Sequence, residues 1–313
     1  MRCAGRGRLS ARRIVQLAAA ALFNGYAAGF AKGEIFTGAS KAFCVPVLNC
    51  YSCPGALGSC PIGALQAALG GTQRSFPFYV LGTLMLFGVL LGRAVCGLLC
   101  PFGLVQDLLH KIPTPKLRVP RRVDRPLRRL KYVVLALMVV VLPFVVAGAE
   151  GIAPPFFCEF LCPAGTLGAG IPLLIADGDL RGLVGALFNW KVAVLVAILV
   201  AAVLIPRPFC RYLCPLGAFY SLFNRFSLAQ VELDRSRCTG CGACAKACPM
   251  AVEPAREPAS SECIRCGKCA RVCPASALTC TFAGKPVGRR RGAGRVEDAR
   301  RVGDARETSS PEA

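Results

Sequence analysis

Four apolar segments dominate the first two thirds of the chain. They cover residues 14–31, 76–95, 132–149 and 183–206. Each is close to the roughly 20 apolar residues that a helix needs to cross a lipid bilayer. The arginines before Ile14 also suit a signal peptide, but the first run exceeds the about 15 residues of a signal's apolar region, which favours a retained helix. The pattern therefore predicts four transmembrane helices.

Beyond the last predicted span the sequence becomes hydrophilic and changes character twice. Residues 227–284 are compact and rich in cysteine, whereas from residue 285 onward the chain is mostly Arg, Gly, Ser and Glu without hydrophobic periodicity. A composition of the latter kind is typical of disordered segments. We therefore expect a membrane domain over 1–226, a small second domain over 227–284 and a basic, disordered tail over 285–313.

Charged residues sort the predicted spans between the two sides of a membrane. Between residues 111 and 131 there are nine Lys or Arg and one acid, Asp124, whereas the loop over 150–191 has four acids and two bases. Loops rich in Lys and Arg stay in the cytoplasm. Four spans then place both termini on the cytoplasmic side of the inner (cytoplasmic) membrane. Because this topology explains the net charge of +21, membrane lipid is the expected partner and nucleic acid is not.

Eight of the 20 cysteines form two identical runs in the second domain. Each run has the spacing C-x2-C-x2-C-x3-C-P of bacterial ferredoxins, in which the fourth cysteine ligates the other run's cluster. Zinc sites would leave this spacing unexplained, and the cytoplasm reduces disulfides. We therefore predict an α+β ferredoxin domain with two [4Fe-4S] clusters. The ligands are Cys238, Cys241, Cys244 and Cys273 for cluster 1, and Cys263, Cys266, Cys269 and Cys248 for cluster 2.

An octapeptide, C-x-x-L-C-P-x-G, occurs three times beside the ends of apolar segments. The copies cover residues 96–103, 158–165 and 210–217, and a truncated copy begins at Cys60. We call each Cys-Pro sequence a CP site. Each half of the membrane domain then has the order helix, CP site at the outer face, helix, CP site at the inner face. We therefore expect an all-α, four-helix membrane domain with a two-fold internal repeat. Pro101 and Pro215 suit the first turn of short helices that follow the inner sites.

Two copies of the octapeptide supply four thiols at the cytoplasmic face. Residues four apart share one face of a helix, so Cys96 with Cys100 and Cys210 with Cys214 can offer four ligands to one cubane or tetrathiolate metal. The alternative is that small residues simply let helices pack closely. We favour an inner redox or metal site, because packing alone would accept Ala or Ser.

Six further cysteines are expected on the outer face, and they exceed the four ligands of one cubane. A cluster on four of them competes with disulfides throughout, which an oxidising compartment permits. The CPxG sequences shared with the inner sites favour a metal. A helix of 18 residues is about 27 Å long, so centres at both faces would shorten an electron's path. The six are Cys44, Cys50, Cys53, Cys60, Cys158 and Cys162.

These motifs resemble those of membrane-bound 4Fe-4S proteins of the NapH/NosR type, which join a four-helix membrane part bearing C-x3-C-P motifs to a double-cubane ferredoxin domain. The resemblance covers most of residues 76–280, and the sequence Cys-Gly-Leu-Leu-Cys-Pro-Phe-Gly from Cys96 is similar to the inner-site consensus. It implies electron transfer between a quinone pool or cytoplasmic donor and a redox partner outside. The third octapeptide and the cysteine-rich loop over 44–60 depart from the two-motif pattern, so no substrate is carried over.

The combined prediction is a membrane iron–sulfur electron-transfer protein, an electron-transfer subunit of an oxidoreductase system. Its expected partners are redox proteins and a quinone or quinol. Asp107 and His110 are candidates for exchanging quinol protons, and the competing interpretation is that they face lipid headgroups. Two other functions stay open, namely a maturation factor that supplies electrons or metal to an extracytoplasmic metalloenzyme and a redox-sensing membrane subunit.

Overall fold

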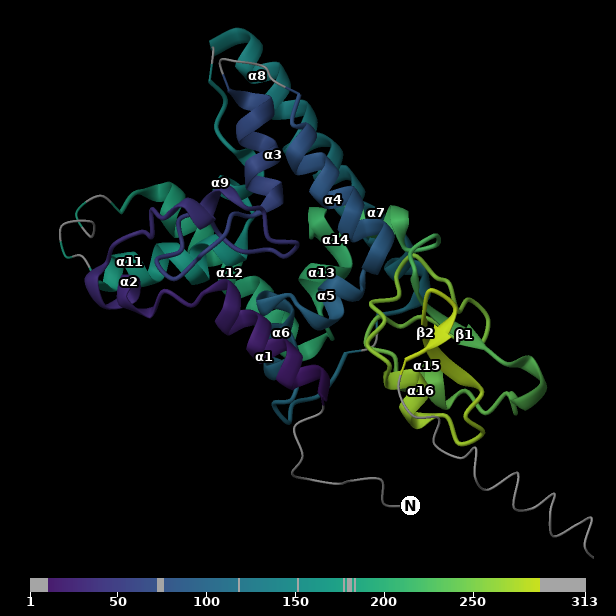
Figure 1. Cartoon of the computed structure of the whole chain (residues 1–313). Coiled ribbons are helices and arrows are strands. Elements are labelled where there is room, and N and C mark those ends of the chain that lie inside the picture. Colours follow the sequence, from purple (N-terminus) through teal and green to yellow (C-terminus); the bar gives the residue numbers. More distant parts are fainter. Residues whose placement is uncertain are drawn as a thin grey trace, which may run out of the picture.

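A helical region and a small mixed region make up the chain (Figure 1). The computed structural model describes residues 11–71, 76–117, 119–150, 152–176, 178, 182 and 184–287. The arginine-rich first ten residues and most of the tail predicted over 285–313 lie outside these ranges. Strands and two short helices, drawn in green to yellow, form the mixed region beside one end of the helical one.

Helices occur near all four predicted spans, but their bounds differ from the predicted ones. The corresponding elements are α1 (Ala11–Phe23) with α2 (Ala27–Lys32), α4 (Phe78–Leu91), α7 (Arg121–Val134) continued by η2 (Leu135–Val141) and α8 (Leu142–Glu150), and α12 (Ala186–Leu204). Two described helices, Arg121–Val146 and Ala186–Leu204, are long and apolar enough to cross a membrane, and Phe78–Leu91 and Pro163–Ala176 are shorter apolar helices.

The first predicted span is divided in two, which the apolar composition of residues 14–31 concealed. The break follows α1 at Asn24 and Gly25, where the Asn24 side chain donates to the carbonyl of Ala20 at 3.2 Å. Side chains of Asn that bond nearby carbonyls compete with the helix, and Gly weakens it further. The 13 residues of α1 therefore form a helix of about 20 Å, shorter than a bilayer core of about 30 Å.

The second and third predicted spans differ from the structure for different reasons. Helix α4 ends before the predicted residue 95 because Gly92, with φ of 54°, turns the chain against Asn224. The third span begins earlier than predicted, since its basic first turns are helical from Arg121. The fourth is close to the predicted 183–206, and residue 183 lies outside the described part of the chain.

Each CPxG sequence starts a helix with its cysteine at the N-cap and its proline in the first turn. Proline suits this position because its missing N–H would have no helical partner there. This confirms the positions predicted for Pro101 and Pro215. The four helices are α3 (Pro61–Gly70), α6 (Pro101–Leu109), α10 (Pro163–Gly165), which continues through η3 (Thr166–Gly170) into α11 (Ile171–Ala176), and α14 (Pro215–Phe223).

Helix contacts occur in corresponding pairs between the two halves of the helical region. Helix α1 packs on α6, and α7 packs on α14; α12 packs on α6, and α4 packs on α14. The short helices α5 (Ala94–Leu98) and α13 (Pro208–Tyr212) precede α6 and α14, and α9 (Phe156–Phe160) precedes α10. Each inner CP helix therefore packs on the first long helix of its own half and on the second long helix of the other half.

The mixed region has the expected α+β composition. Strands β1 (Ala229–Leu233), β2 (Leu278–Phe282) and β3 (Lys285–Pro286) form an antiparallel sheet in the order β1-β2-β3, with Val231 opposite Cys280. Helices α15 (Ala243–Ala247) and α16 (Lys268–Val272) each contain the third cysteine of one run, and they contact one another. Strand β1 precedes the first cysteine run and β2 follows the second, so their pairing joins the two ends of the segment that contains both runs.

Candidate metal centres

The predicted ligands of cluster 1 line one cavity at the surface of the mixed region. Cys238, Cys241, Cys244 and Cys273 open onto a space of about 430 Å³, walled by Leu233, Ala277 and Leu278 among others. A water molecule occupies only about 30 Å³, so this space suits a group of many atoms. Four cysteine thiols are the donor set of a [4Fe-4S] cluster, which these residues therefore fit.

The predicted ligands of cluster 2 also lie together, and they are more buried. Burial raises the pKa of Cys263 to about 11, and the neighbouring thiols of Cys248 and Cys266 add to the rise. Burial likewise raises the pKa of Cys269 to about 12, with contributions from Cys263 and Cys266. Thiols crowded in this way favour a cationic group that replaces their protons.

A fifth thiol stands beside the cluster 2 cysteines. Cys280, on β2, affects the pKa of Cys269, and a Cβ placed on Gly267 would lie 3.6 Å from its sulfur. The ferredoxin spacing gave no reason to include it, because Cys280 lies outside both runs. Strand β2, which pairs with β1 and contacts α16, brings it to this site.

The four inner cysteines are all buried, and the structure brings them together. Burial raises the pKa of Cys100 to about 12, and the thiols of Cys210 and Cys96 raise it further. The pKa of Cys214 is raised by burial and by the same two thiols. Gln106 donates through Nε2 to the sulfur of Cys210 at 3.1 Å. Two halves of the chain thus contribute two thiols each to one buried group, which we name the inner quartet.

Two arginines cross between the halves beside the inner quartet. Arg93 donates to the backbone carbonyl of Cys210 at 3.0 Å, and Arg207 donates to the carbonyl of Cys96 at 2.8 Å. Both side chains have no exposed surface. Each arginine stands three residues before its own half's first inner cysteine and binds the other half's first inner cysteine. Sequence reasoning missed them, although their matching positions in the two copies were visible.

Four of the six outer cysteines lie together, and the other two lie outside this group. Burial and the thiols of Cys158, Cys50 and Cys60 all raise the pKa of Cys162. Burial and the thiols of Cys60 and Cys50 raise the pKa of Cys158 to about 12. We name Cys50, Cys60, Cys158 and Cys162 the outer quartet.

The remaining outer cysteines have other neighbours. Cys53 adjoins Cys50 and lies 3.7 Å from the side-chain oxygen of Asn24, whereas the sulfur of Cys44 lies 3.5 Å from the hydroxyl of Ser59. All cysteines in the described ranges are free thiols. No group of three or more His, Cys, Asp or Glu side chains in those ranges is arranged around a single metal ion. A cubane has four irons for its four cysteines and spreads its ligands farther apart.

The CPxG sequence has the same local geometry at both quartets. The backbone N–H of the glycine donates to the sulfur of the cysteine that caps the helix, as from Gly217 to Cys214 at 3.3 Å. Equivalent bonds join Gly103 to Cys100, Gly63 to Cys60 and Gly165 to Cys162. Free N–H groups and the dipole at a helix start favour negative charge. Every CPxG sequence therefore prepares one sulfur for a thiolate role.

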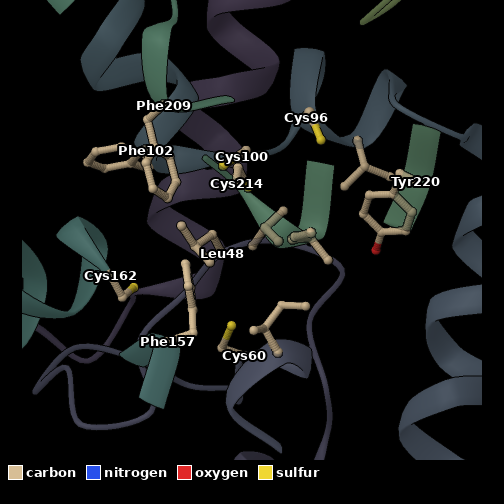
Figure 2. Packing of buried hydrophobic residues seen from close by; sticks show 14 of the residues in the cluster. Leu48, Cys60, Cys96, Cys100, Phe102, Phe157, Cys162, Phe209, Cys214 and Tyr220 are labelled. Atoms are coloured by element: carbon tan, nitrogen blue, oxygen red, sulfur yellow. The ribbon is translucent and has the colours of Figure 1, made fainter. Parts of the chain in front are cut away.

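Cysteines of both quartets lie in one hydrophobic core, which includes Cys96, Cys100 and Cys214 from the inner quartet and Cys60 and Cys162 from the outer one. In Figure 2, Leu48 lies between the inner cysteines Cys100 and Cys214 and the outer cysteines Cys60 and Cys162, and Phe157 lies beside the outer pair. Burial raises the pKa of Tyr220, and thiols of both quartets, Cys96 and Cys60, raise it further. One side chain therefore lies within electrostatic reach of both quartets.

Asp107 has a structural role in the described part of the chain. Asp107 pairs with Arg207 at 2.7 Å and with Arg12. Burial alone would raise its pKa, but the hydrogen bond and charge of Arg207 and the charge of Arg12 outweigh burial and lower it to about 2. Burial lowers the pKa of His110, and Lys116 adds to this. Asp107 is thus a buried ion-pair partner that stays ionised at neutral pH, which does not suit a proton carrier.

Two sequence families match the chain in the segments that hold these cysteines. A family described as "4Fe-4S binding domain" matches residues 76–120, 132–174 and 188–230, so each match contains one octapeptide. A family described as "4Fe-4S dicluster domain" matches residues 230–274. The chain therefore carries several 4Fe-4S binding domains.

Curated relatives share between a quarter and a third of their aligned residues with this chain. The methylamine utilization ferredoxin-type protein MauN of Paracoccus denitrificans is 32% identical over 62% of this chain and 62% of its own length. The putative electron transport protein YccM of Escherichia coli is 29% identical over 54% of this chain and 44% of its own length. The regulatory protein NosR of Pseudomonas aeruginosa is 33% identical over 56% of this chain and 23% of its own length.

The chain spans about half to three fifths of the length of the first relatives that it matches. No solved structure matches the chain significantly.

Proposed function

Since this chain is a 4Fe-4S ferredoxin-type protein of the NapH/NosR type, with MauN, YccM and NosR among its homologues, we propose that it passes electrons between a cytoplasmic donor or quinone pool and a redox partner across a membrane. One observation carries this proposal. Cysteines of both quartets share a buried core, and the mixed region contacts the inner quartet's own segment, where a Cβ added to Gly97 would collide with the carbonyl oxygen of Ile264.

We propose four clusters, each held by four cysteines. Clusters 1 and 2 take the ligands predicted from the two runs, and the inner and outer quartets take one cluster each. When bound, each cluster supplies a centre that accepts and returns one electron. This proposal uses 16 of the 20 cysteines. Of the other four, Cys44, Cys53 and Cys280 are free thiols close to the sites, and Cys3 lies outside the described residues.

The chain's own residues hold negative charge in place at the quartets. Helix starts at Cys100 and Cys214 direct N–H groups at the inner sulfurs, and Arg93 and Arg207 add two positive charges. Packing of Phe102 and Phe209, whose ring centroids are 5.3 Å apart, excludes water from the same core. A buried, positively charged pocket of this kind favours the added negative charge of a reduced centre.

We further propose that four helices cross the membrane with both chain ends in the cytoplasm. The long apolar helices Arg121–Val146 and Ala186–Leu204 support two of the spans. The shorter apolar helix α4, which packs on α14, supports the third, and α1, which packs on α6, is the proposed fourth. The basic first turns of α7 would then lie at the anionic inner leaflet. Lipid, quinone and a redox protein are the proposed partners.

Electron transfer to a quinone tests this function. Anaerobically purified protein is reduced with dithionite, and reoxidation of its iron–sulfur absorbance by a soluble quinone analogue is followed. We expect Cys214→Ser to stop reoxidation through the membrane part while the reduced-state paramagnetic signals of clusters 1 and 2 persist. Intact clusters that exchange no electrons with quinone or quinol analogues in either direction would instead favour the maturation or sensing functions.

A further inference from the structure

The mixed region touches the inner quartet through a contact between two backbones. A Cβ added to Gly97 would collide with the carbonyl oxygen of Ile264 and would lie 3.6 Å from the Ile264 Cβ. Gly97 follows Cys96 of the inner quartet, and Ile264 follows Cys263 of cluster 2. The contact is buried, with Ile264 1% exposed. At this point one residue on each side separates a cysteine of the inner quartet from a predicted ligand of cluster 2.

A buried carboxylate holds this contact from one side. Glu262 accepts from Arg93 at 2.7 Å and from Lys131 at 2.5 Å, and neither base has any exposed side-chain surface. Since Arg93 also binds the carbonyl of Cys210, the same guanidinium joins the mixed region to the inner quartet.

Asn224 holds the contact from the other side. Its Nδ2 donates to the carbonyls of Ser260 at 2.8 Å and Cys263 at 2.9 Å, so the segment before Ile264 is fixed to the end of α14. Its Oδ1 accepts from the backbone N–H of Arg93 at 3.1 Å. Asn224 therefore ties together the chain on both sides of the Gly97–Ile264 contact.

The two cysteine runs differ at the position that faces this interface. The first run has Gly240 with φ of 67°, whereas the second has Arg265 at the equivalent position with φ of 49°. A left-handed conformation is strained for arginine and not for glycine. The Arg265 side chain donates to Oδ1 of Asn224 at 3.1 Å and to its backbone carbonyl. In the second run, the strained backbone of Arg265 places its side chain in contact with Asn224. The first run faces solvent instead, and its Cys238 and Cys241 are exposed.

We propose that the Gly97–Ile264 contact is the junction between cluster 2 and the inner quartet, and that cluster 1 is the terminal centre that meets a soluble carrier. The proposed electron path follows covalent bonds from Cys263 to the Ile264 carbonyl, crosses the contact to Gly97, and follows covalent bonds again to Cys96. One electron crosses at a time, so the centre on one side is oxidised as the other is reduced, and no bond or proton changes. A one-electron donor and an acceptor at the two ends complete the balance. This inference rests on the proposed function.

A glycine substitution tests the junction, with a second glycine as its control. Gly97→Ala forces the two backbones apart, whereas Gly82→Ala, on α4, places its Cβ where nothing lies within 4 Å. We expect Gly97→Ala to keep the wild-type iron content, to lose the magnetic splitting between cluster 2 and the inner centre in the reduced protein, and to slow electron transfer between them by about an order of magnitude. Gly82→Ala should match wild type in all three measurements.

Hydrogen–deuterium exchange of residues 260–265 gives a readout that needs no electron flow. Both Gly97→Ala and Glu262→Gln should accelerate exchange in this segment, and Gly82→Ala should not. If Gly97→Ala fails to fold, the Glu262→Gln variant tests the junction in its place, by the same measurements of magnetic splitting and hydrogen–deuterium exchange. Wild-type splitting and exchange in a loaded variant would overturn the junction alone. An inner quartet without iron in the wild-type protein would instead overturn the proposed function, whatever the exchange shows.

Discussion

The inner and outer quartets use the same local motif in different surroundings. Each contains two cysteines that cap CPxG helices, and in each the glycine N–H donates to the capping sulfur. The inner quartet completes its set symmetrically, with one CxxxC pair from each half. The outer quartet has only one such pair, Cys158 with Cys162, because Ala56 stands where the other half would need a cysteine. Cys50, from a loop, takes that place.

Charge distinguishes the two quartets more strongly than ligand position does. The inner quartet has Arg93 and Arg207, both without exposed surface. The outer quartet has Lys191, which affects Cys50 and Cys158, and Lys41, which affects Cys50 and Cys53. Net charge and hydrogen bonds to sulfur set the potential of an iron–sulfur cluster. If each quartet holds a cluster, as proposed, we expect one motif to prepare two centres of unequal potential, with the inner one easier to reduce.

Removing an inner ligand should have the largest effect. We expect Cys100→Ser to lose about four irons per chain, since a [4Fe-4S] cluster needs its full cysteine set. Iron and acid-labile sulfide analysis of the purified protein measures this loss. Cys44→Ser is the matched control, because Cys44 lies outside the outer quartet, and it should retain all iron. Equal iron in both variants would return the inner cysteines to a packing role.

The asymmetric ligand of the outer quartet should give the next largest effect. We expect Cys50→Ser to lose up to about four irons, while the neighbouring Cys53→Ser retains them. The loss is smaller than at the inner site if Cys53, which adjoins Cys50, replaces it in part of the molecules. Iron analysis of the two variants side by side measures the difference. Identical losses would show that the division into quartet and bystander is incorrect.

Removing a buried arginine should destabilise the inner site more than removing a lysine destabilises the outer one. Arg207→Met takes away the partner that Asp107 holds at 2.7 Å, and breaking a buried pair costs about 3–5 kcal/mol. Lys191→Met should cost no more than about 1 kcal/mol. Thermal unfolding in detergent compares the two, and a redox titration should show a lower inner potential in Arg207→Met only. Equal shifts would remove the electrostatic distinction.

Acid should weaken the inner side through Asp107. Because its folded pKa of about 2 lies below the ordinary value of 3.8, its contribution is fully present above about pH 4 and is lost as pH falls toward 2. The difference corresponds to stability of about 2 kcal/mol. Asp107→Asn should therefore flatten the dependence of unfolding temperature on pH in this window. A wild-type slope in that variant would assign the acid sensitivity to other carboxylates.

Local patterns explain how much of the fold could be predicted from the sequence. The repeated CPxG sequences specify helix starts, and the two cysteine runs specify a ferredoxin-type unit, because in both cases nearby residues determine the geometry. Hydropathy located the apolar helices but concealed the break at Asn24, since one polar side chain and a glycine outweigh an apolar average.

Long-range contacts explain what the sequence left open. Spacing could not show that Cys50 rather than Cys53 completes the outer quartet, because the choice depends on how the loop packs against Gly165, whose added Cβ would lie 3.6 Å from the Cys50 sulfur. Nor could it show that Arg93 is buried against Glu262, 169 residues away.

Iron and acid-labile sulfide in anaerobically purified wild-type protein test the central claim most directly. Four loaded sites predict about sixteen irons and a similar number of sulfides per chain, of which about eight belong to the two ferredoxin-type sites. A count of about eight, with paramagnetic signals from clusters 1 and 2 alone, would contradict clusters in the inner and outer quartets.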